Sequence, residues 1–77
     1  MFRNKNLSVL YYANGFTGWH YKSDESLDVV KQDGFFNMVY TLMNCGDTII
    51  VVTPDTTDIL YVSEIDGETV KTKRIGE

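Results

Sequence analysis

The chain has 77 residues, of which 43% are hydrophobic and 23% are charged, and its formal net charge is −4. A domain of this size buries only about 60% of the surface that it exposes when unfolded, so we expect one domain that gains stability from a partner subunit. The acidic balance argues against nucleic acid as a partner, and the lack of a long apolar run or a basic-then-apolar leader argues against a membrane span and a signal peptide.

The N-terminal part of the chain predicts an arm followed by a hairpin. Residues 1–6 are mostly polar, with Arg3 and Lys5, and lack hydrophobic periodicity, which is typical of a flexible arm that is either frayed or ordered by a partner. Residues 7–12 have the pattern of a strand, and Asn14-Gly15 is a strong two-residue turn signal because both positions tolerate positive φ. Residues 17–22 would be the returning strand. We therefore expect a single small domain over residues 7–77.

The segment after this hairpin predicts two short helices. Ser23 can cap the first helix, which has an apolar stripe at Leu27 and Val30 and ends at Gly34. Asn37 can cap the second helix, and its buried face would comprise Met38, Val39, Leu42 and Met43. Isolated helices this short are marginal in water, so both are expected to pack on a sheet.

The last third of the chain predicts three further strands. Residues 48–53 are apolar at successive positions, so we expect a strand covered on both sides, with Ile50 and Val51 both in the core. Turn signals separate it from strands over residues 58–65 and 68–75, in which neither face is wholly apolar. The expected fold is α+β, a small, mainly antiparallel sheet of about five strands with two short helices in one connection.

No group of residues in the sequence has the spacing of a reactive site. His20 is the only histidine, and a metal site usually needs three or four convergent ligands. Cys45 is the only cysteine, and a thiol near the C-terminal end of a predicted helix lies at the wrong end of the helix dipole for thiolate formation. The glycines lack a phosphate-binding spacing. We therefore predict a protein that is not an enzyme and has no catalytic residue, metal or cofactor.

Aromatic side chains are the one feature that points to a function. They make up 13% of the chain, and about half of the large rings are needed for the core. The others exceed what one short sheet and two short helices can bury, which favours an association surface. The rings concerned are Tyr11, Tyr12, Phe16, Trp19, Tyr21, Phe35 and Phe36. Of these we predict Tyr11, Tyr12 and Trp19 to be interface residues.

A series of aromatic, glycine and apolar positions extends over residues 14–70, namely Asn14 to Lys22, Leu27, Val30, Gly34 to Asn37, and Gly46 to Val51. In this order the chain resembles a set of small uncharacterised proteins encoded in tailed bacteriophages and prophages, often close to genes for virion structural proteins. The resemblance implies a virion component present in many copies, such as a decoration, head-fibre or tail-associated protein.

These observations lead to a functional expectation and a rival. We expect a non-enzymatic structural protein of a phage virion, made in the cytoplasm of the bacterial host, that contacts other virion proteins and forms a homo-oligomer, with a trimer favoured by analogy with other phage decorations. The rival is a small acidic host-interaction protein that inhibits its target by charge mimicry. Stoichiometry separates the two, because a virion protein purifies with particles at a fixed copy number.

Overall fold

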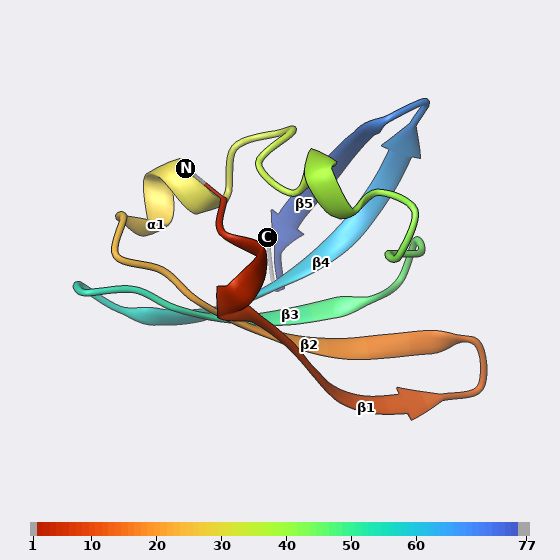
Figure 1. Ribbon diagram of the computed structural model, residues 1–77, viewed down its shortest axis with the longest axis horizontal. Helices are drawn as coiled ribbons and strands as arrows, with labels where there is room; N and C mark the ends of the chain where they lie inside the picture. Colours follow the sequence, from red (N-terminus) through yellow and green to blue (C-terminus); the bar gives the residue numbers. More distant parts are fainter. Residues whose placement is uncertain (1, 76–77) are drawn as a thin grey trace.

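A five-stranded mixed sheet forms the body of the protein in a computed structural model, which describes residues 2–75 (Figure 1). The strands are β1 (Leu7–Ala13), β2 (Phe16–Lys22), β3 (Thr48–Val52), β4 (Thr57–Asp66) and β5 (Thr69–Arg74), and they lie in the sheet in this order. β2 and β3 pair in parallel, and the other neighbours pair antiparallel. The prediction of a small sheet-rich domain is confirmed.

The connection between β2 and β3 contains much less helix than the sequence predicts. α1 spans only Leu27–Val30, and the second predicted helix is a 3-10 turn over Asn37–Val39. The reason is that the two predicted cap residues, Ser23 and Asn37, make other hydrogen bonds than those of a helix start. The Ser23 hydroxyl bonds to the backbone of Glu25, and the Asn37 side-chain oxygen accepts a hydrogen bond from the Val70 N–H at 2.8 Å. The Ser23 bond closes a local turn, and α1 begins only after Ser26, whereas the Asn37 oxygen is occupied by Val70. Neither helix therefore starts at its predicted cap.

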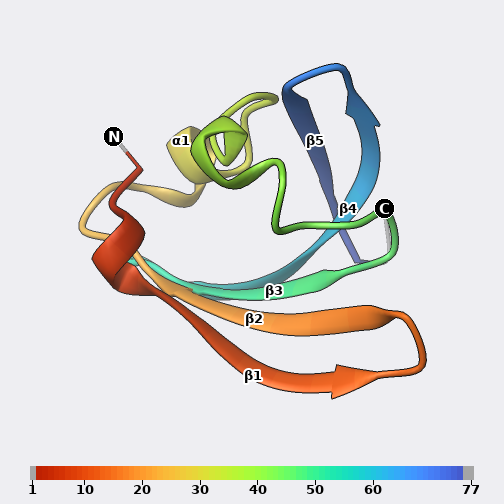
Figure 2. The same ribbon diagram turned by 45° about the vertical axis from the view of Figure 1, so that its right-hand side comes forward.

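This connection covers one face of the sheet only, as Figure 2 shows. The covered face carries alternate strand residues, which pack against apolar side chains of the connection to form the core. From the sheet come Trp19, Tyr21, Ile49, Val51, Leu60, Val62 and Val70, and from the connection come Leu27, Val30, Phe36, Val39 and Met43. We call the opposite side the uncovered face.

The strand β3 is therefore not covered on both sides. Val51 is fully buried, as predicted, but Ile50 points to the uncovered face and is only half-buried. The prediction that Ile50 lies in the core is wrong. Successive apolar residues in a strand require cover on both sides, and within this chain the connection supplies it on one side only. The apolar pattern of β3 thus leaves Ile50 on a face that the connection does not cover.

The N-terminal segment contributes a ring to the core. Phe2 is buried and stacks on Tyr21 with ring centroids 5.3 Å apart, and the Arg3 N–H donates to the Tyr21 hydroxyl at 2.9 Å. Edge contacts with Phe35 and Phe36 complete this aromatic cluster. Residues Asn4–Asn6 then form a 3-10 turn that leads into β1. Phe2 thus attaches to the core the segment that the sequence predicts to be an arm, whereas residues 3–5 are exposed.

Asp58 provides a pH-dependent contribution to the stability of the β4–β5 hairpin. Its carboxylate accepts hydrogen bonds from the Ile59 N–H at 2.7 Å and from Arg74 Nε at 2.6 Å. The Ile59 N–H, followed by Arg74, lowers the pKa of Asp58. A lowered folded-state pKa gives stability that is present above the unfolded value, about 3.9, and is lost as the pH falls through the folded value.

We therefore expect an Asp58→Asn variant to lose less stability than the wild type on acidification below about pH 4. Thermal unfolding of both proteins over an acidic pH series measures this difference. Parallel pH profiles for the two proteins would show that Asp58 does not contribute in this way.

Candidate interaction surface

The buried side chain of Asp47 fixes the start of β2 through hydrogen bonds. The residue is completely buried, and its carboxylate accepts hydrogen bonds from the Thr17 N–H at 2.9 Å, from Trp19 Nε1 at 3.1 Å and from the Asn44 N–H at 3.0 Å. A single side chain thereby joins the end of the connection to β2. The sequence does not reveal this role, because an aspartate after a glycine is the ordinary signal of a solvated turn.

The same contact decides the position of Trp19. The indole nitrogen is directed at Asp47, and the ring is only 6% exposed, within the core. Trp19 therefore offers almost no surface to a partner. The sequence assigned it to an interface because nothing in its own chemistry distinguishes a core ring from a surface ring, and Asp47 is far away in sequence.

Tyr11 and Tyr12, the other two predicted interface residues, do lie on the surface. Tyr12 is 78% exposed and Tyr11 is 46% exposed. The Tyr11 ring crosses β2 above Gly18, where a Cβ atom would collide with it, and the Tyr11 hydroxyl lies 3.0 Å from the hydroxyl of Thr48. Gly18 thus provides the space that lays the Tyr11 ring flat over the uncovered face.

Further apolar side chains surround this tyrosine on the uncovered face. The strand registers place alternate residues of β2, β3 and β4 on that face beside Tyr11. Phe16, Ile59 and Ile75 are exposed there, and Ile50 and Tyr61 are half-buried. Together these six residues are the apolar patch of the uncovered face. Lys71 and Lys73 flank it on β5, and Lys71 lies 3.9 Å from Glu64.

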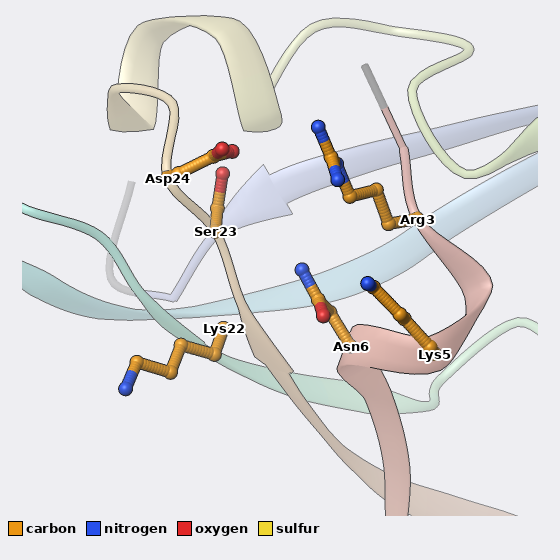
Figure 3. Close-up of a pocket in the computed structure, with 6 residues that line it drawn as sticks. All are labelled: Arg3, Lys5, Asn6, Lys22, Ser23 and Asp24. Atoms are coloured by element: carbon orange, nitrogen blue, oxygen red, sulfur yellow. The ribbon is translucent and has the colours of Figure 1, made fainter.

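A polar pocket of about 320 Å³ lies near the N-terminal segment. Its lining comprises Arg3, Lys5, Asn6, Lys22, Ser23 and Asp24. Figure 3 shows Arg3, Lys5 and Asn6 on one side and Ser23 and Asp24 on the other, with Lys22 directed away. The Ser23 hydroxyl is already bonded to Glu25, and the charged side chains are exposed. Exposed charges of this kind interact weakly, so this pocket is a solvated cluster rather than an ordered binding site.

His20 and Cys45, the only histidine and the only cysteine of the sequence, belong to different parts of the fold. His20 is half-buried on the uncovered face, and Cys45 is exposed in the turn before β3. Within residues 2–75, no group of three or more His, Cys, Asp or Glu side chains is placed to hold a metal ion. No helix in that part of the chain is long and apolar enough to cross a membrane.

Comparisons of this chain with models of protein families, with curated proteins and with solved structures found no match. The most distinctive surface of the chain is the apolar patch of the uncovered face together with the exposed strand β1.

Proposed function

We propose that this protein is a non-enzymatic structural component of a bacteriophage virion that acts through protein-protein contacts, as a decoration, head-fibre or tail-associated protein. The phage context comes from the resemblance described above. The observation that carries the contact role is the apolar patch of the uncovered face, where Ile59 is 41% exposed and Phe16 and Ile75 are also accessible. Contiguous exposed apolar surface in a small protein marks an association site.

The architecture of the domain is consistent with a protein that assembles in many copies. One face of the sheet has its own cover, and the other face presents apolar residues of several strands to the outside. A chain of this size has a small core, so contacts with copies of itself or with other virion proteins add burial that the chain cannot supply alone. We therefore propose a homo-oligomer that attaches to the particle through protein contacts.

Mass spectrometry of purified particles tests this proposal. Peptides of the chain are expected in the particles at a fixed ratio to the major virion proteins, through repeated purification. An Ile59→Lys variant places a charge in the apolar patch and is expected to reduce incorporation at least severalfold, without a change in circular dichroism. Thr57→Lys adds the same charge to an exposed position of the same strand and serves as the matched control. Presence in infected cells with absence from particles would contradict the proposal.

A second candidate is a small acidic protein that binds a host target by charge mimicry. Asp24, Asp28 and Asp33 are exposed in the connection around α1, where the Asp28 side chain is 87% exposed. Lys31 lies 3.4 Å from Asp28 and offsets part of this charge. Early synthesis and exclusion from particles in the same experiment would favour this candidate.

A further inference from the structure

The strand β1 is an unprotected edge of the sheet. It has a neighbour on one side only, and it lies at the margin opposite β5 (Figure 2). Its seven residues include no charge and no proline, and Val9, Leu10, Tyr11 and Tyr12 are all substantially exposed. An exposed apolar edge of this kind is a template for pairing with another strand.

The other edge of the same sheet is protected. β5 carries Lys71, Lys73 and Arg74, and charged side chains are a common means of preventing edge pairing. In addition, the Val70 N–H donates to Asn37 and the Val70 carbonyl accepts from the Gly34 N–H, both at 2.8 Å. The chain thus closes one edge and leaves the other open, which directs any edge pairing to β1.

The backbone groups that β1 offers outward follow from the direction of β2. The Thr17 N–H donates to Asp47 and the Ser23 N–H donates to the Val52 carbonyl, so both N–H groups point away from β1. The direction of the backbone N–H groups alternates along a strand, so the N–H of Trp19 also points away from β1. Tyr12 lies opposite Thr17, and Val9 lies opposite Trp19. These two pairs are therefore non-hydrogen-bonded pairs of the antiparallel ladder, in which the N–H and C=O groups of Val9 and Tyr12 face outward, away from β2.

These groups have no partner among the described residues. The N–H of Leu7, which would be the next outward group, bonds to the Asn4 carbonyl. A bulge at Leu10 separates Val9 from Tyr12, so the register with β2 shifts between them. The open edge is therefore a short, symmetric pair of sites, one on each side of the bulge.

We propose that the β1 strands of two copies pair antiparallel about a twofold axis that passes between Leu10 and Tyr11. This register sets Val9 of one copy opposite Tyr12 of the partner subunit, and the reverse, so that each outward N–H meets an outward carbonyl. Both strands carry the same bulge, and the two bulges then lie opposite each other. The result is one continuous sheet that spans both copies.

Side chains and charge agree with this register. Val9 and Tyr12 lie opposite the buried residues Trp19 and Thr17, so both side chains are on the same side of the sheet. Pairing would make two cross-strand contacts between an aromatic and a β-branched side chain, which stabilise a sheet. Two copies with a net charge of −4 each would meet along uncharged strands, without like charges at the axis.

This inference rests on the proposed contact role and names a second copy as one partner, with a dimer in place of the trimer expected by analogy. It is tested on the purified chain, so its result is separate from incorporation into particles. Sedimentation equilibrium over a range of concentrations is expected to show a monomer–dimer equilibrium, with a limiting mass of twice 8.8 kDa. Amide hydrogen exchange at Val9 and Tyr12 is expected to slow as the concentration rises.

Two variants of β1 and one control locate the contact. Tyr12→Pro removes an outward N–H without loss of a bond to β2, and is expected to weaken dimerisation about tenfold or more, which corresponds to about 1.4 kcal/mol. Leu10→Lys places two like charges next to the twofold axis, and is also expected to weaken dimerisation about tenfold or more. Ile59→Lys, in the apolar patch, is expected to leave the dimer unchanged.

Circular dichroism establishes that each variant is folded, and if Tyr12→Pro unfolds, Leu10→Lys decides. A monomer at every concentration, or a trimer, would overturn the inference. So would a dimer that resists the β1 variants, or one that is broken by Ile59→Lys instead.

Discussion

Replacing Asp47 by asparagine is expected to destabilise the protein by about 3 kcal/mol, because hydrogen bonds to a charged group are worth about 1.5–3 kcal/mol each. One carboxylate oxygen accepts from Thr17, and the other accepts from both Trp19 and Asn44. An amide has one oxygen and one NH₂ group, so in either orientation at least one buried N–H would face another donor. A typical domain has only about 5–15 kcal/mol of stability in total, so the loss is large.

Urea unfolding followed by the fluorescence of Trp19, the only tryptophan, measures this effect directly. Asp66→Asn makes the same chemical change at the exposed end of β4 and is expected to alter the free energy of unfolding by less than about 0.5 kcal/mol. Equal effects of the two substitutions would show that the contacts of Asp47 do not stabilise the fold.

Ile49→Ala and Ile50→Ala are expected to differ strongly, although they make the same change at neighbouring positions of β3. Ile49 is fully buried beneath the connection, and truncation of such a side chain costs about 2–5 kcal/mol. Ile50 is half-buried on the uncovered face, so its truncation in the monomer is expected to cost about 1 kcal/mol. Urea unfolding at low protein concentration gives both values.

The Ile50→Ala variant also separates stability from association. If the apolar patch contacts a partner, this variant is expected to lose particle incorporation more than it loses folding stability. An Ile50→Ala protein as unstable as Ile49→Ala would instead mean that the uncovered face is buried within the chain, which would remove the basis for an association surface there.

The edge of β1 and the apolar patch share Tyr11 but otherwise comprise different residues. Pairing of β1 would extend the sheet sideways, whereas the apolar patch is presented on the uncovered side of that sheet. A dimer joined at β1 would therefore still present two copies of the patch. This arrangement would let a pair of chains attach to a particle through a larger apolar surface than one chain provides.

Local sequence patterns were sufficient to predict the strands and the first hairpin turn, but not the length of the helices. Asn14 and Gly15 adopt positive φ in the turn between β1 and β2, as their small or polar side chains predict. Alternating and apolar runs located the strands, because the period of side chains along a strand is a local property. The exposure of Tyr11 and Tyr12 also agrees with the expectation that the chain has more large rings than its core can hold.

The tertiary structure alone decided which neighbours these segments have. The bond between Asp47 and Trp19 joins residues far apart in sequence, and it holds a turn aspartate and a predicted interface ring in the interior. The bond between Asn37 and Val70 likewise takes away a predicted helix cap. Ile50 is uncovered because the connection crosses one face of the sheet only. Periodicity tells which residues share a face, but the path of the chain decides which face is covered, and that path depends on contacts between distant residues.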